Sequence, residues 1–183
     1  MPELSYPVAL HDGTLRLRPW AAGDVGCIER ASADPEIPRG TTVPALYTVP
    51  EGLAFIRRQH ARLTSGQGIS LAIAREDTDE AVGLVIVQIR PQPGVAGVGY
   101  WVVPDERRRG FAGRAVSLAA SWALGPGGFA RVEAWVDPAN TASRRTLERC
   151  GFELEGRLRS FLVLAGRRYD ALVYSRIAVD RGR

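Results

Sequence analysis

Residues 107–115, with the sequence RRRGFAGRA, are the part of this chain best suited to hold a phosphate group. Gly110 and Gly113 lack the side chains that would keep a diphosphate away from the backbone. The apolar stretch that follows suits a helix, and a helix start presents unpaired N–H groups with partial positive charge. A plain tight turn would also use the glycines, but the adjacent arginines favour anion binding. The pattern predicts a cofactor phosphate held by backbone amides.

Asn140 and Ser143 form a second candidate group. Asn140 precedes a helical stretch at 141–149, where its side chain is suited to cap the first turn. Ser143 would lie in that turn, where a hydroxyl commonly bonds to the local backbone. Cys27 and Cys150 are too few for a disulfide framework and belong to no cluster with metal-ligand spacing, so we expect two buried thiols and no metal.

All 24 basic residues are arginine, which excludes two reaction classes. Schiff-base catalysis needs a lysine amine, and the usual phosphate loop of nucleotide hydrolases needs a lysine on its phosphates. A dinucleotide-binding fold needs three glycines, and Arg108 stands in place of the first. The net charge of +4 comes from arginines spread from Arg16 to Arg183, which does not favour a nucleic-acid-binding surface.

The 183 residues suit a single domain spanning 1–183, with 45% hydrophobic and 24% charged residues. No run approaches the roughly 18 to 20 apolar residues that a membrane span requires. The first residues lack the charged and then apolar layout of a signal peptide. We therefore expect a cytoplasmic protein with no membrane association.

The first half of the chain predicts an antiparallel sheet with helices. A half-buried strand at 14–18 leads into a helix at 23–32, and the breaker-rich segment 34–49 suggests an irregular loop. An amphipathic helix at 50–64 follows. The strands expected next form a meander over 69–74, 81–89 and 95–103.

The second half alternates between helices and strands: a helix at 111–124, a strand at 130–136, a helix at 141–149, and a hairpin of strands 152–164 and 168–177. Strands 95–103 and 130–136, joined by a helix, suit a parallel pair with a right-handed crossover. The glycine turn then lies at the carboxyl end of the first strand, where α/β proteins commonly bind ligands.

Arg107, Gly110 and Ala112 resemble the Gln/Arg-x-x-Gly-x-Gly/Ala signature of the GNAT N-acetyltransferase superfamily, whose members bind the diphosphate of acetyl-CoA at this turn. The segment NTASRRTLERCGF at 140–152 resembles the second segment of that superfamily. Segments 15–19, 34–36, 99–101 and 169–177 resemble its RimJ/RimL-type branch.

The resemblance implies a mixed α/β fold with a twisted, mostly antiparallel sheet of about seven strands and about four flanking helices. One parallel pair would splay to leave a slot for the pantetheine arm. It implies acetyl transfer from acetyl-CoA, by direct attack in a ternary complex, to the α-amine of a protein or peptide or to a small amine. The expected partners are these two substrates and, in a homodimer, a second copy of the chain.

By the same resemblance, Ser143 would donate a proton to the CoA sulfur and Asn140 would contact pantetheine. Backbone N–H groups near Tyr100 would polarise the acyl carbonyl, which makes Tyr100 a third catalytic candidate. The residues expected to bind the cofactor are Val102, Val103, Arg107, Arg108, Arg109, Gly110, Phe111, Ala112, Gly113, Arg114, Asn140 and Ser143.

The general base is missing from its usual place, because Gly97 stands where the related branch often carries an acid. Gly97 and Gly99 would instead permit a close backbone approach. Glu133 shares a strand face with Arg131 and could act through water, although a cross-strand ion pair is the stronger expectation. His60 is expected at the surface.

The segment 34–49 and the helix after it should cover one side of the acceptor site. Tyr47 and Trp101 are candidate walls of that site, and Trp101 suits the core equally well. Two further functions remain open. One is transfer from a bulkier acyl-CoA such as succinyl-CoA, and the other is an acyl-CoA-binding regulatory module without catalysis.

Overall fold

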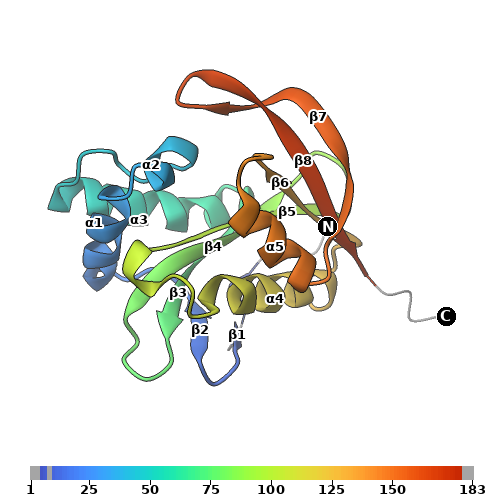
Figure 1. Ribbon diagram of the computed structural model, residues 1–183. Coiled ribbons are helices and arrows are strands. Elements are labelled where there is room, and N and C mark those ends of the chain that lie inside the picture. The colour runs from blue at the N-terminus through green and yellow to red at the C-terminus, as the bar shows by residue number, and fades with distance from the viewer. Residues whose placement is uncertain (1–4, 8–9, 179–183) are drawn as a thin grey trace.

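The computed structural model describes residues 5–7 and 10–178. Its elements surround one twisted sheet (Figure 1). The strands are β1 (Leu10–His11), β2 (Leu15–Arg18), β3 (Gly68–Arg75), β4 (Ala81–Ile89), β5 (Val95–Val102), β6 (Arg131–Val136), β7 (Glu153–Leu164) and β8 (Arg167–Ile177). The α-helices are α1 (Val25–Ser32), α2 (Glu36–Gly40), α3 (Val49–Thr64), α4 (Phe111–Leu124) and α5 (Thr141–Arg149). Two 3₁₀ turns, Ala22–Asp24 and Pro104–Glu106, precede α1 and α4.

The sheet has the strand order β1-β2-β3-β4-β5-β6-β8-β7, and β5 with β6 is its parallel pair. The remaining neighbours are antiparallel, so the expected meander, crossover and terminal hairpin are confirmed. The described residues form eight strands, where about seven were expected. The two-residue β1, which pairs with β2, is too short to show a period-two pattern in the sequence.

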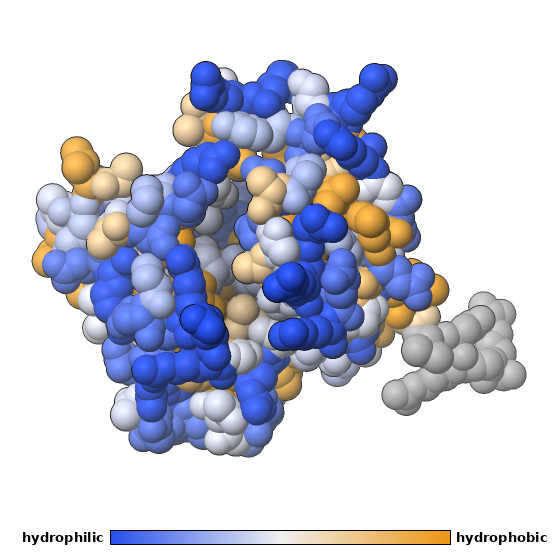
Figure 2. Space-filling view, viewed as in Figure 1, coloured by the Kyte–Doolittle hydropathy of each residue, from blue (hydrophilic) through white to orange (hydrophobic). Residues whose placement is uncertain are grey.

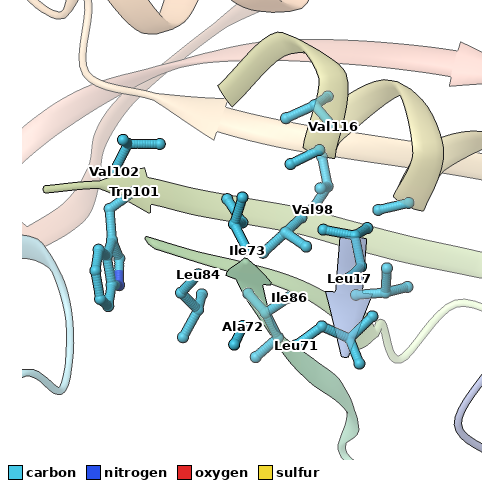
Figure 3. Packing of buried hydrophobic residues seen from close by; sticks show 14 of the residues in the cluster. Leu17, Leu71, Ala72, Ile73, Leu84, Ile86, Val98, Trp101, Val102 and Val116 are labelled. Carbon is cyan, nitrogen blue, oxygen red and sulfur yellow. The ribbon is translucent and has the colours of Figure 1, made fainter. Parts of the chain in front are cut away.

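Helices cover both faces of the sheet (Figure 1). Helix α4 packs on β4 and β5 and contacts α5, whereas α3 packs on β3 and contacts α1. Figure 3 shows Val98 and Val116 together on the α4 side of β5, with Trp101 on the opposite side. Trp101 packs there against Trp20 and Phe55, with ring centroids 6.2 and 6.5 Å away. Alternate residues of β5 therefore face two different layers of the core.

The segment 34–49 contains α2, so the expectation of an irregular loop was wrong for its first part. Pro38 does not prevent this helix, because it lies in the first turn, where its missing N–H has no acceptor within the helix. With α2, the part of the chain that the structure describes contains five α-helices, where about four were expected. Helix α2 is short, but it belongs to a segment that contacts the site described below.

Candidate cofactor site

A slot opens between β5 and β6, which pair over only three residues. The pairs are Val95 with Arg131, Ala96 with Val132 and Gly97 with Glu133. Beyond Gly97 and Glu133, which we call the vertex, each strand continues with its outer neighbour alone. Figure 2 shows the surface hollowed between the part that carries α1–α3 and the part that carries α5 and the β7–β8 hairpin. The splayed parallel pair expected from the family resemblance is therefore present.

The β5 edge of the slot offers backbone N–H groups. Val103 N–H donates to Val82 O of β4 at 2.9 Å. Successive N–H groups of a strand point to opposite edges, so those of Tyr100 and Val102 point toward the slot. Past the vertex they have no partner on β6. Val103, expected at the cofactor, has its N–H engaged with β4, its carbonyl oxygen accepts from Glu106 N–H at 3.1 Å, and its side chain is fully buried, so the structure gives Val103 a supporting role.

The turn between β5 and α4 has the backbone shape of an anion cradle. Arg108 and Gly110 both adopt positive φ, at 64° and 83°. Glycine tolerates this region, whereas Arg108 is strained there, and such strain clusters at functional sites. Among the described residues, the N–H groups of Phe111, Ala112 and Gly113 have no backbone acceptor, because the first N–H to find one is that of Arg114, which donates to Gly110 O at 3.1 Å. These free donors suit a diphosphate.

Three of the turn's arginines support the protein itself. Arg107 donates through Nε to Val102 O at 3.0 Å and pairs with Asp34 at 2.6 Å. Arg109 pairs with Glu106 at 3.1 Å, and Arg114 pairs with Asp12 at 2.9 Å. Arg108 is exposed and forms no ion pair within the described residues. The side chains of Arg107, Arg109 and Arg114 therefore fix the shape of the turn, while its backbone carries the free donors.

Asp34 is the buried partner of Arg107, with 7% of its surface exposed. Burial alone would raise the pKa of Asp34, but the backbone N–H of Glu36 and the Arg107 guanidinium outweigh burial and lower it. The carboxylate is therefore charged at neutral pH. It connects the segment before α2 to the glycine turn.

Gly113 is not required by the protein's own packing. A Cβ atom at this position would lie 3.9 Å from Cys150 Sγ, which is an ordinary contact, and its φ is not positive. The Cys150 thiol in turn donates to Gly113 O at 3.3 Å. Both cysteines are buried and unpaired, as expected. An open first turn at Gly113 leaves room for a ligand close to the helix backbone.

Asn140 and Ser143 lie at the start of α5, on the other side of the slot. Asn140 Oδ1 accepts a hydrogen bond from Ser143 N–H at 3.0 Å, so the predicted cap is confirmed. This bond leaves the exposed amide NH₂ of Asn140 free for a ligand. Gly151 ends the helix with φ at 77°, and Phe152 N–H donates to Leu147 O.

Tyr100 and Ser143 meet across the slot. Tyr100 Oη lies 2.7 Å from Ser143 Oγ and 3.2 Å from the Ser143 carbonyl oxygen. Burial raises the pKa of Tyr100 to about 12, although its hydrogen bond to Ser143 opposes the change. The phenol therefore keeps its proton at neutral pH. The sequence did not predict this contact, because Tyr100 and Ser143 are 43 residues apart; the only signal was that Tyr100 faces away from the core residue Trp101.

Arg90 fills the place where relatives often carry an acid. A Cβ atom at Gly97 would lie 2.5 Å from Arg90 Cζ. Arg90 Nε lies 3.3 Å from Glu133 Oε1, and the guanidinium carbon lies 3.6 Å from the Trp135 ring centroid. Arg131 approaches Glu133 Oε2 at 3.5 Å. The carboxylate of Glu133 thus forms ion pairs with two guanidinium groups, and an ion pair was the stronger expectation for this residue.

Tyr47 and Trp101, the candidate walls of the acceptor site, and His60, which was expected at the surface, all contact other parts of the protein. Trp101 belongs to the aromatic core. Tyr47 is half-buried, and a Cβ atom at Gly52 would lie 3.0 Å from Tyr47 Cε2, so Tyr47 packs against α3. His60 is exposed, as expected, and its Nε2 lies 2.7 Å from Trp20 O.

Residues 34–39, which we call the bridge segment, contact both sides of the slot, one formed by β5 and the other by β6 and β8. Asp34 binds Arg107 after β5. At the other end, Arg39 lies 3.9 Å from Asp137, which follows β6, and 5.0 Å from the ring centroid of Tyr169 on β8. The bridge segment therefore spans the open end of the slot between β5 and β6.

Within residues 5–7 and 10–178, no group of acidic, histidine and cysteine side chains could hold a metal ion. No described helix has the length and apolar character needed to cross a membrane. The slot, the free donors of α4 and the space at Gly113 fit the pantetheine arm and diphosphate of a CoA thioester. The chemistry within reach is proton donation by hydroxyls and carbonyl polarisation by strand amides.

Comparisons with known proteins agree with this geometry. Residues 14–153 match the family model described as an acetyltransferase (GNAT) domain. The chain is 30% identical over 171 residues to an uncharacterized N-acetyltransferase, YoaA, of Bacillus subtilis, which covers 93% of this chain and 96% of the relative.

Two solved structures share the fold. RimJ of Mycobacterium smegmatis, in complex with CoA-disulfide, superposes with a TM-score of 0.80 at 24% identity and covers 92% of this chain and 84% of its own. RimL, a ribosomal L7/L12 alpha-N-protein acetyltransferase in complex with coenzyme A, has a TM-score of 0.79 at 20% identity and covers 93% and 98%.

Proposed function

The chain belongs to the GNAT acetyltransferase family, and we propose that it transfers the acetyl group of acetyl-CoA to a primary amine by direct attack in a ternary complex. The acceptor is the α-amine of a protein or peptide, or a small amine. The observation that carries the proposal is the hydroxyl pair of Tyr100 and Ser143 inside a slot that also exposes strand amides and ends at an anion cradle. Binding alone would not require the hydroxyl pair.

The β5 amides and the glycine turn bind different parts of acetyl-CoA. Bound acetyl-CoA supplies an activated acyl group. The free N–H groups of Phe111, Ala112 and Gly113 take the diphosphate, and the amide NH₂ of Asn140 contacts the pantetheine arm. The N–H groups of Tyr100 and Val102 polarise the acyl carbonyl, an arrangement that stabilises the negative charge that develops during attack.

Ser143 donates the proton that the departing thiolate needs, Tyr100 passes its own proton to Ser143, and solvent water returns a proton to Tyr100. When Tyr100 Oη–H points at the Ser143 carbonyl oxygen, the Ser143 hydroxyl donates to Tyr100. When Tyr100 instead donates to Ser143 Oγ, the proton of Ser143 is free to point into the slot. The two hydroxyls can therefore pass a proton toward the sulfur without either becoming charged beforehand.

Solvent water accepts the proton of the amine in this proposal. Gly97 carries no acid, and both oxygens of Glu133 face guanidinium groups. Arg90 and Arg131 therefore occupy the Glu133 carboxylate, and neither of its oxygens is without a cationic partner. The reactive acceptor is then an amine that has already lost its proton in solution.

The test is a steady-state assay of free CoA release over a panel of N-terminal peptides and small amines. Acetylated product, verified by mass, should appear with at least one acceptor. Tight binding of acetyl-CoA without turnover of any amine would instead indicate a regulatory module. Turnover with succinyl-CoA but not with acetyl-CoA would show that the acyl donor is succinyl-CoA.

Gly110 and Gly113 provide matched variants for the cofactor assignment. Gly110→Val places a bulky side chain at a positive φ and in the cradle, and should abolish acetyl-CoA binding. Gly113→Ala fits the protein itself, so it should leave thermal stability unchanged and weaken acetyl-CoA binding several-fold through a close contact alone. Unchanged affinity in both variants, measured by calorimetry, would contradict the diphosphate site.

A further inference from the structure

Arg90 lies at the vertex of the slot, where strand pairing ends. It follows β4, and its backbone N–H donates to Val95 O at 3.0 Å. Its side chain then crosses the face of β5 at Gly97 and reaches β6, with 15% of the side chain exposed. Arg90 therefore contacts both strands at the point where they begin to separate.

The contacts of Arg90 join the paired and unpaired parts of β6. Glu133, which is 13% exposed, belongs to the last pair of the parallel ladder. Trp135 lies two residues further, where β6 pairs only with β8. The contact with Glu133 is an ion pair without a hydrogen bond, whereas the guanidinium stacks on the Trp135 ring, a planar contact that lysine cannot reproduce. At the vertex, on the face opposite α4 and α5, Arg90 therefore links β5 to both the paired and the unpaired part of β6.

Gly97 makes the arrangement feasible. A Cβ atom there would overlap the guanidinium, while the backbone of Gly97 is not in the positive-φ region and would accept alanine. The absence of an acid at this position is therefore linked to the presence of Arg90, because a side chain at 97 and the guanidinium occupy the same space.

We propose that Arg90 is a positioning residue that sets the opening of the slot and so the fit of the pantetheine arm. This inference rests on the proposed function, because it concerns the same cofactor. Arg90 contacts no part of the glycine turn, so its effect should be confined to the pantetheine half of CoA. The nucleotide half is bound by the turn beyond the far end of β5.

The test compares two ligands, acetyl-CoA and 3′-phosphoadenosine 5′-diphosphate, which is the nucleotide half of CoA. Arg90→Met should lower the affinity for acetyl-CoA about tenfold and leave the affinity for the nucleotide half unchanged. Arg90→Lys should recover only part of the loss, because it keeps the charge without the stacking plane. Arg30→Met, which removes a similarly half-buried arginine paired with Glu80 and Asp105, is the matched control and should change neither affinity.

A double-mutant cycle tests the contact itself. Gly97→Ala should displace the guanidinium and reproduce the loss seen in Arg90→Ala, both in acetyl-CoA affinity and in the free energy of unfolding. Adding Gly97→Ala to Arg90→Ala should cause no further loss, because the overlap is gone. Additive effects would show that Gly97 acts independently of Arg90.

The outcomes separate this inference from the proposed function. Wild-type protein that binds neither ligand overturns the proposed function, and the positioning role falls with it. If the wild type binds both ligands and Arg90→Met binds them with the wild-type affinities, the positioning role alone is overturned. The same holds if Arg90→Met loses equal affinity for both ligands. A loss confined to acetyl-CoA, together with a non-additive cycle, supports it.

Discussion

In the proposed mechanism, the reacting centre depends on two hydroxyls whose protons can be arranged in two ways. Tyr100 has one proton and two acceptors within reach, Ser143 Oγ and the Ser143 carbonyl oxygen. Only the arrangement in which Tyr100 donates to Oγ frees the proton of Ser143 for the slot. The raised pKa of Tyr100, about 12, keeps this donor protonated over the whole range in which an amine acceptor becomes neutral.

Replacing each hydroxyl should therefore lower turnover to different extents. Ser143→Ala removes the group next to the slot and should reduce kcat about 100-fold, whereas Tyr100→Phe should reduce it about tenfold, with little change in acetyl-CoA affinity. In the wild type, kcat/KM should rise with pH as the acceptor loses its proton and then stay level to about pH 10, since Tyr100 does not titrate there.

Steady-state kinetics from pH 6 to 10 with a single peptide acceptor would measure these effects. Glu133→Gln is the control for a carboxylate base, and it should keep the same pH profile and most of the activity. An unchanged rate in Ser143→Ala would return Ser143 to a capping role. Loss of the pH dependence in Glu133→Gln would identify Glu133 as the base.

The elements that form the slot could largely be predicted from the sequence. The glycine turn and the Asn140 cap are local signals, because backbone φ and helix ends depend on neighbouring residues. Helix α2 was missed, since five residues are too few to show a helical period in the sequence. The contacts across the slot, such as those of Arg90 and Tyr100, depend on side-chain direction after folding, which no spacing encodes.

The bridge segment should affect the two substrates differently through its two ends. Asp34→Asn removes the charged partner of Arg107 and should weaken acetyl-CoA binding several-fold, with a loss of about 1 to 2 kcal/mol in stability. Arg39→Met releases only the Asp137 and Tyr169 end, so it should change the KM of the acceptor and leave acetyl-CoA affinity unchanged. Calorimetry and two-substrate kinetics would separate these effects. Equal effects of both variants on both substrates would contradict a bridge with two distinct ends.

At the scale of the whole molecule, ion pairs join segments that are far apart in sequence, and each uses arginine, because the chain contains no lysine. The pair of Asp12 and Arg114 joins the β1–β2 turn to α4, and the pair of Glu155 and Arg131 joins β7 to β6. The family resemblance predicted a mostly antiparallel sheet with one parallel pair, and the strand order of the structure brings these segments together. It could not predict the pairs, because many arginines could reach each carboxylate.

These pairs predict how stability depends on pH. The hydrogen bonds of Arg131 and Ser175 lower the pKa of Glu155 to about 2. Burial would raise the pKa of Asp12, yet its bonds to Arg114 and to the backbone N–H groups of Thr14 and Leu15 lower it. The backbone N–H of Ser160 and then Arg157 lower the pKa of Asp170. A carboxyl group whose folded pKa is lowered stabilises the protein above its unfolded pKa of about 4 and loses this effect as pH falls through the folded value.

The free energy of unfolding should therefore be level above about pH 5 and fall steadily from about pH 4 toward pH 2. Urea titrations at fixed pH values would measure it, and Glu155→Gln should flatten the lower part of the curve. Added salt should weaken the contribution of the exposed Glu155 pair more than that of the buried Asp34. A stability that rises on acidification would mean that these carboxylates are not charged partners in the folded state, and that the arginines stabilise the sheet through packing alone.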